Sequence, residues 1–184
     1  VRKAVAGARF TNLDAQGNPT TGEHVAVRDN QTGLEWSAAP LEGGNDMNHA
    51  DAMKACAALN LAGHKDWRAP TVKELLTIVE YERFDPAVDP AHFKGPYGWT
   101  WTSTPYAGRP SGAAWDVYLD YGYSGWGVHD GDDHARAVRA GQRRMASASW
   151  HDLCHRTRVP GPLRPARSRL RRQGGSRHPL GKGL

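Results

Sequence analysis

The chain has 184 residues, of which 39% are hydrophobic and seven are tryptophans, and this is enough apolar material for one folded domain with a sizeable core. Two cysteines cannot build a disulfide framework, and no apolar run reaches the roughly 18 residues that a membrane-spanning helix needs. The net charge of +5 is unevenly distributed: residues 1–142 hold 13 Lys/Arg and 18 Asp/Glu, giving −5, whereas residues 143–184 hold 11 Lys/Arg and one acid, giving +10. The acidic first part argues against polyanion binding by the folded domain itself.

The first predicted elements form an antiparallel hairpin. Residues 10–21 indicate a strand followed by a loop, after a flank at residues 1–9. Residues 24–28 alternate between apolar and polar, residues 29–33 (Asp-Asn-Gln-Thr-Gly) supply turn chemistry, and residues 34–37 return as the next strand.

A helix is predicted over residues 49–61, with Asn48 as its N-cap. Gly63 follows where the helical pattern ends, the usual place for a left-handed C-terminal cap. Cys56 lies on this helix, and we expect it to be a small buried residue and not a reactive thiol.

A short link connects this helix to a second one. Its Asp66, Trp67 and Arg68 are expected to fix the angle between the helices through an ion pair or backbone hydrogen bonds. The T-x-x-E pattern of residues 71–74 is a capping box, which begins a helix predicted over residues 72–82. The residues that we expect to have structural roles are Trp36, Asp66, Trp67, Arg68, Thr71, Glu74, Trp101 and Trp115.

The period of the apolar residues changes to two at Trp99, after a loop with two Asp-Pro pairs that end helical structure. In residues 99–104, Trp99, Trp101 and Ser103 alternate with three threonines, which predicts a half-buried strand. Residues 115–121 alternate between a set expected in the core and a set expected in water, namely Trp115, Val117, Leu119 and Tyr121 against Asp116, Tyr118 and Asp120.

The end of the domain completes an antiparallel meander. Residues 122–127 predict a turn or bulge, the chain returns from Trp126, an acidic turn covers residues 129–133, and residues 135–139 form the closing strand. Helices followed by strands place the domain in the α+β class. Residues 143–184 are rich in Arg, Pro and Gly, and we expect them to be disordered.

Five separated motifs occur in a fixed order: GLEW at 33–36, the helix-link-helix core with DWRAPTVKEL at 66–75, WTSTPY at 101–106, AWDVYLDYGY at 114–123 and RAVRAGQ at 136–142. With these motifs the chain resembles the Lcl C-terminal domain family, found in collagen-like adhesins, over about residues 10–142. The resemblance implies a fold similar to C-type lectins and sulfatase-modifying factors, in which two helices pack on a twisted antiparallel sheet.

The resemblance also implies a location and a class of ligand. It indicates an extracellular, cell-surface or periplasmic module that binds a surface glycan, a sulfated polysaccharide or a protein receptor, without a cofactor. The chain begins at Val1 with no apolar leader segment, as a fragment or a mature form would. The family commonly has a cysteine in its closing strand, where this chain has Ala137, so the bridge to Cys56 that the family pattern implies is absent.

Exposed aromatic rings beside hydrogen-bonding side chains make recognition surfaces, because a ring supplies a large contact area at small rotamer cost. The late strands and loops offer such a face for a glycan or a protein. We expect Trp99, Trp101 and Trp115 to pack in the core, while Tyr118, Tyr123 and Trp126 fit packing and recognition equally well. The candidate ligand-binding residues are Tyr106, Asp116, Tyr118, Asp120, Tyr123, Ser124, Trp126 and His129.

Three other functions are less well supported. The acidic turn at 129–133 offers oxygens for calcium but lacks the EF-hand spacing, so no metal ligand is assigned. Enzyme motifs are absent from the sequence, and Asp66 or Asp120 as an acid or base is the remaining catalytic hypothesis, with an enzyme related to sulfatase-modifying factors as the alternative. The basic residues 143–184 suit contact with polyanions.

Overall fold

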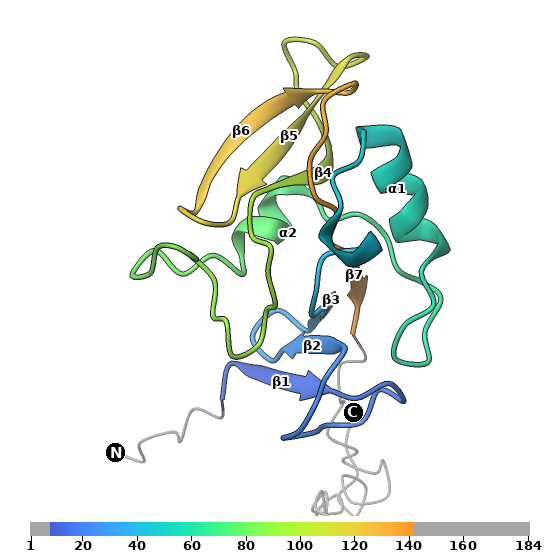
Figure 1. Ribbon diagram of the computed structural model, residues 1–184, viewed down its shortest axis with the longest axis vertical. Coiled ribbons are helices and arrows are strands. Elements are labelled where there is room, and N and C mark those ends of the chain that lie inside the picture. Colours follow the sequence, from blue (N-terminus) through green and yellow to red (C-terminus); the bar gives the residue numbers. More distant parts are fainter. Residues whose placement is uncertain (1–7, 142–184) are drawn as a thin grey trace, which may run out of the picture. The chain divides into compact units, whose positions relative to one another are not determined.

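Two antiparallel sheets and two short helices make up residues 8–141, the part that the computed structural model describes (Figure 1). Residues 1–7 and 142–184, including the segment predicted to be disordered, lie outside the described residues. The order of elements is β1 (Phe10–Leu13), β2 (Ala26–Asp29), β3 (Leu34–Ser37), the 3₁₀ turn η1 (Glu42–Gly44), α1 (His49–Ala58), α2 (Val72–Leu76), β4 (Trp99–Pro105), β5 (Ala113–Tyr118), β6 (Tyr123–Val128) and β7 (Val138–Ala140). This part of the chain is mostly sheet and is compatible with the predicted α+β class.

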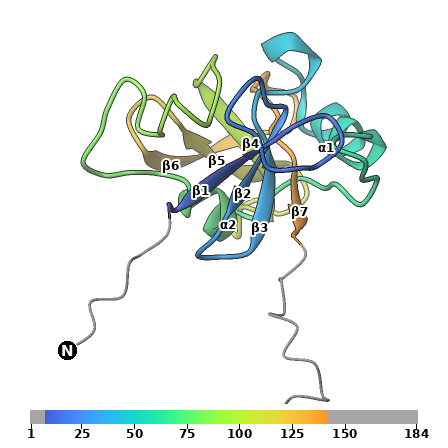
Figure 2. The same cartoon turned by 90° about the horizontal axis from the view of Figure 1, so that it is seen from below.

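The first sheet has the strand order β1-β2-β3-β7. It confirms the predicted hairpin, with Val27 paired to Trp36. The prediction that the closing strand belongs to the late meander is wrong, because Val138 of β7 pairs with Trp36 of β3 and also exchanges backbone hydrogen bonds with Arg68. A period of two predicts a strand but not its neighbour. Figure 2 views the domain from the end that carries this sheet.

The second sheet is the meander β4-β5-β6, with Trp99 paired to Tyr118 and Tyr118 paired to Tyr123. The predicted turn at 122–127 is wrong: the turn lies at 119–122, and β6 runs on from Tyr123. Gly122 makes this turn possible with φ of +76°, and a Cβ there would lie 2.7 Å from Val79 Cγ1.

Both helices are shorter than predicted. α1 begins at the expected N-cap, since Asn48 accepts a hydrogen bond from the Asp51 N–H, but it ends at Ala58, and Gly63 (φ +77°) lies in a later turn. α2 ends at Leu76 and not near Glu82, because the Glu80 N–H donates to the Ala87 carbonyl outside the helix.

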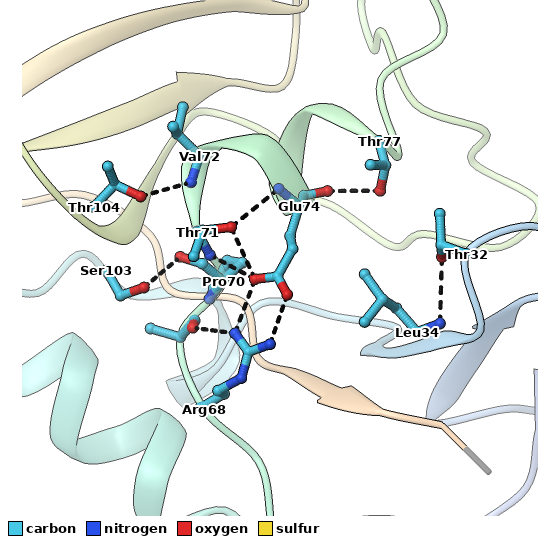
Figure 3. A network of polar contacts seen from close by, with 11 residues as sticks. Thr32, Leu34, Arg68, Pro70, Thr71, Val72, Glu74, Thr77, Ser103 and Thr104 are labelled. Carbon is cyan, nitrogen blue, oxygen red and sulfur yellow. Dashed lines mark hydrogen bonds and ion pairs between the residues drawn. The ribbon is translucent and has the colours of Figure 1, made fainter. Parts of the chain in front are cut away.

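The link between the helices, residues 66–71, is held by a network of hydrogen bonds (Figure 3). Arg68 donates two bonds to the Glu74 carboxylate at 2.8 and 2.6 Å, and Thr71 and Glu74 form the complete capping box. The pairing with Arg68 and the bonds from Thr71 lower the pKa of Glu74 to about 2. Ser103 donates to the Pro70 carbonyl at 3.1 Å, so the network also fixes the link to β4.

Asp66 and Arg68 do not pair with each other. Asp66 accepts from Arg139 Nε at 2.7 Å, and Arg139 also pairs with the buried Glu35 of β3. The predicted structural link is therefore made by two separate ion pairs, one to α2 and one to the closing strand.

The core consists of two apolar clusters that meet at the closing segment, residues 135–139, all of which are buried. Val138 belongs to the cluster with Trp36, Leu75 and Phe93, whereas Ala135 and Ala137 belong to the cluster on α1. Between them, the fully buried Arg136 donates to the carbonyls of Ser37, Ala38 and Lys94 at 2.8, 2.8 and 2.9 Å.

Cys56 is buried in the α1 cluster with Ala137, and its thiol lies 3.8 Å from the Arg136 carbonyl oxygen. Burial raises the pKa of this thiol to about 12, so it stays protonated and unreactive. The residue that stands where the family commonly has a cysteine therefore lies in the same apolar cluster as Cys56.

We predict that Ala137→Cys forms a disulfide with Cys56 under oxidising conditions. Cross-linking two segments so far apart in sequence raises the free energy of unfolding by about 2–4 kcal/mol. Thiol alkylation with mass spectrometry measures the bond, and denaturation with and without reductant measures the gain. Ala58→Cys, on an exposed position of the same helix, is the control that forms no intramolecular bond with Cys56; failure of Ala137→Cys to cross-link would contradict the packing described here.

Candidate functional site

Strand alternation divides the aromatic residues of the second sheet into two groups. Trp99, Tyr118 and Tyr123 form one cross-strand row, and Trp115 pairs with Trp126 at positions of opposite parity on β5 and β6. Because successive side chains point to opposite sides of a sheet, the two groups lie on opposite faces. The single aromatic face predicted from the sequence is therefore two surfaces. We call them the tyrosine face (Trp99, Tyr118, Tyr121 and Tyr123) and the tryptophan face (Tyr106, Trp115 and Trp126).

The tyrosine face lies at the end of the sheet where β5 turns into β6. Tyr118 lies 5.3 Å from Tyr121 and 5.5 Å from Tyr123 between ring centroids, and Trp99 contacts Tyr118 at 5.0 Å. Tyr121, predicted in the core, is 53% exposed, because β5 ends at Tyr118 and the alternation does not continue into the turn. Asp120 lies in the same turn, half-buried.

The tryptophan face is built by stacking. The rings of Tyr106 and Trp126 are nearly parallel, 4.8 Å apart, and Tyr106 meets Trp115 edge-on at 5.6 Å. Trp126 is 50% exposed, whereas Trp115 is less exposed and partly covered, so the Trp126 indole is the one that is open to a partner. Ser124 lies on this face by strand parity, opposite Val117.

Asp116, predicted to face water, is only 4% exposed and lies on the same side of the sheet as Tyr118. Its neighbours on β6 are Gly125 and Gly127. A Cβ added at Gly125 would lie 2.9 Å from Asp116 Oδ1 and 2.8 Å from the Trp99 indole. A Cβ added at Gly127 would lie 2.9 Å from Asp116 Oδ2 and 2.7 Å from the Trp101 indole. These glycines let the two indoles lie across β6 beside the carboxylate. Its Oδ1 has no hydrogen-bond partner, and burial raises the pKa of Asp116 to about 6.

A second carboxylate with a raised pKa lies near Asp116. Burial, followed by the charges of Asp116 and Asp46, raises the pKa of Asp133 to about 7. His129 stacks on His49 with centroids 4.4 Å apart, and His49 meets Trp101 edge-on at 5.2 Å. This association could not be predicted from the sequence, because His49 and Asp133 lie far apart in the chain.

The model of the Lcl C-terminal domain family matches residues 25–139. This range covers more than half of the chain and contains every strand except β1 and the last residue of β7. The chain belongs to the Lcl C-terminal domain family. No curated protein matches it.

The structural residues of this Lcl C-terminal domain lie mostly in its interior. Trp36, Trp67 and Trp101 are 0%, 3% and 1% exposed. The indole N–H of Trp67 donates to the Leu61 carbonyl at 3.1 Å, and that of Trp101 donates to the Met47 carbonyl at 2.8 Å. Trp36 and Trp101 thus anchor one sheet each.

The exposed apolar side chains of the Lcl C-terminal domain are concentrated in two segments. Within residues 8–141, every exposed large hydrophobic residue lies between 81 and 84 or between 121 and 128, namely Tyr81, Phe84, Tyr121, Tyr123, Trp126 and Val128. The two segments adjoin, because the Asp85 N–H donates to the Asp120 carbonyl at 2.6 Å and the Ala87 N–H to the Leu119 carbonyl at 2.9 Å.

Across residues 8–141 no three His, Cys, Asp or Glu side chains gather in a way that would hold a metal ion. The hypothesis that residues 129–133 bind calcium is tested by titrating calcium while thermal stability is followed. None of the helices in the same range is long and apolar enough to span a bilayer.

We predict that Asp116→Asn stabilises the protein at neutral pH. The folded pKa of about 6 lies above the ordinary value of 3.8, so the folded state binds the proton more tightly between these values and the free energy of unfolding falls as the pH rises through that window. The variant lacks this loss and should gain about 2 kcal/mol at pH 8 and little at pH 3.

Urea denaturation of the full chain at both pH values measures the difference. The exposed Asp130→Asn serves as the matched control and should change stability equally little at either pH. Equal effects of the two variants at pH 8 would show that the Asp116 carboxylate is well solvated or well paired.

Proposed function

We propose that this Lcl C-terminal domain is a noncatalytic, adhesin-like recognition module that binds a surface glycan or a protein receptor through the aromatic end of its second sheet. The proposal includes a fold related to C-type lectins and an extracellular, cell-surface or periplasmic location, and it requires no cofactor. Membership of the family supports an adhesin-like role. Six of the eight candidate ligand-binding residues divide between the two faces of this sheet, whereas Asp120 and His129 lie in the turns that follow β5 and β6.

One observation carries the proposal: the exposed large apolar side chains of the described residues are gathered at 81–84 and 121–128. Exposed apolar side chains scattered singly need no explanation, but a group of them marks an interaction site. Aromatic rings dominate the group, and aromatic residues are enriched in binding surfaces because they bury large areas with few rotatable bonds.

The surroundings of the carboxylates support a noncatalytic role. Asp66, one hypothetical acid or base, has its pKa lowered chiefly by the hydrogen bond from Arg139, which suits an ion pair better than proton transfer at neutral pH. Asp116 has the raised pKa that an acid would need, but its side chain is buried beside two indoles, out of contact with a substrate in solution.

The charge of the domain supports a ligand other than a polyanion. Residues 8–141 contain 11 Lys/Arg and 18 Asp/Glu, a net charge of −7. Polyanion binding, the alternative, would use the basic residues 143–184. It predicts retention on any polyanion that disappears with moderate salt and with removal of those residues.

We predict that Tyr123→Ala and Trp126→Ala each lower the retention of the full chain on a glycan and receptor array by about tenfold, since each removes an exposed ring. Because both side chains are half-exposed, the free energy of unfolding should change by less than about 1 kcal/mol. Gln31→Ala, at an exposed turn of the other sheet, is the control and should retain wild-type binding.

Retention that is unchanged in both aromatic variants would contradict recognition by this end of the sheet. Turnover of a retained ligand that disappears in Asp116→Asn or Asp120→Asn would favour the enzymatic alternative instead.

A further inference from the structure

Three tyrosines of the tyrosine face form a small cluster of rings in mutual contact, which we call the cage. Tyr121 and Tyr123 have nearly parallel rings, at 10°, with centroids 6.4 Å apart. Tyr118 closes one side, 5.3 and 5.5 Å from the other two and tilted by 54° and 44°. Tyr121 and Tyr123 are 53% and 50% exposed, so ring surface of the cage is open to a partner in solution.

The cage is preorganised by the turn that carries it. Gly122 packs against Val79 and Ala87 so closely that an added Cβ would clash, and its N–H donates to the Tyr118 carbonyl at 2.8 Å. On the flank, Trp99 meets Tyr123 edge-on at 5.5 Å and so fixes the second wall. A site already in its binding geometry loses little entropy when a ligand enters.

The turn that carries the cage is acidic. Residues 118–123 contain one charged residue, Asp120, and no lysine or arginine. Asp120 lies close to the cage: burial, followed by the charge of the Asp120 carboxylate, raises the pKa of the Tyr118 hydroxyl. The arginine of the neighbouring loop, Arg83, is paired with Glu80 at 2.6 Å and lies 3.7 Å from Asp89.

We infer that the cage of Tyr118, Tyr121 and Tyr123 binds an arginine side chain of a protein partner. The faces of tyrosine rings attract cations within about 6 Å of their centroids. The planar, weakly hydrated guanidinium stacks on aromatic rings better than the compact ammonium of lysine, and its donors suit the Asp120 carboxylate. The inference rests on the proposed recognition function and names the chemistry of its partner; a sulfated glycan would meet carboxylates here, with no matching cation.

The test uses the full chain and two end-blocked peptides, Gly-Arg-Gly-Arg-Gly and Gly-Lys-Gly-Lys-Gly, in calorimetric titrations at fixed salt. We expect the arginine peptide to bind several-fold more tightly than the lysine peptide. The double variant Tyr121→Leu/Tyr123→Leu keeps apolar volume but loses two ring faces, and should weaken arginine binding about tenfold.

Two further variants separate the cage from general effects. Tyr106→Leu, an aromatic substitution on the tryptophan face, should leave the affinity unchanged. Asp120→Asn keeps every ring and should weaken both peptides about two- to fivefold, as loss of an exposed charge pair does. Near-ultraviolet circular dichroism and thermal unfolding verify that each variant is folded.

Equal affinity for the two peptides, or binding that the double tyrosine variant does not weaken, would overturn the inference. Binding of a neutral oligosaccharide that depends on Tyr121 and Tyr123, without arginine binding, would also overturn it while leaving the recognition function intact. The recognition function itself is tested separately on the array. It would be contradicted if Tyr123→Ala and Trp126→Ala both retained ligands as well as the wild type does.

Discussion

The described domain depends on one buried cation. Arg136 has no carboxylate partner within residues 8–141 and instead donates to three backbone carbonyls, at the end of β3, in the residue after it and in the loop before β4. Hydrogen bonds to a charged group contribute about 1.5–3 kcal/mol each. Burial lowers the pKa of this guanidinium to about 10, so it remains charged at physiological pH. Because these bonds end on backbone atoms of separate segments, Arg136 fixes the position of those segments relative to one another. The neighbouring residues 137–139 connect the two apolar clusters to each other and to the link between the helices.

This frame explains why the aromatic end of the second sheet can be both exposed and ordered. β4 is held to the link by Ser103 and to the region before α1 by the Trp101 indole, while the β5–β6 turn is held to residues 85–87 by backbone hydrogen bonds. The rings therefore gain their positions from buried neighbours and need not contribute to the core. A binding surface of this kind tolerates substitution of its rings, because stability resides elsewhere.

The local elements could be predicted from the sequence, whereas their assembly could not. The hairpin, the Asn48 cap and the capping box of Thr71 and Glu74 follow from residue chemistry over a few positions, and all are present. Contacts between distant segments cannot be predicted from a single sequence. They decide which strand pairs with β7, which residues pair with Asp66 and Arg68, and why Asp116 is buried. The division of the aromatic residues between two faces follows from strand parity, but only once the end of β5 at Tyr118 is known. The chemistry of the ligand is the hardest property to predict from the sequence. The cage forms only because β5 ends at Tyr118 and leaves Tyr121 in the turn.

In this structure a rigid frame thus presents the aromatic end of the second sheet to a partner. Hydrogen–deuterium exchange of the full chain, with and without a saturating arginine peptide, distinguishes the frame from the binding surface, since exchange reports where amides are protected by binding. We expect slowed exchange confined to the amides of residues 80–87 and 118–123, with the link at 66–71 and the first sheet unchanged. Slowed exchange concentrated in the link or the first sheet, with residues 118–123 unaffected, would contradict it.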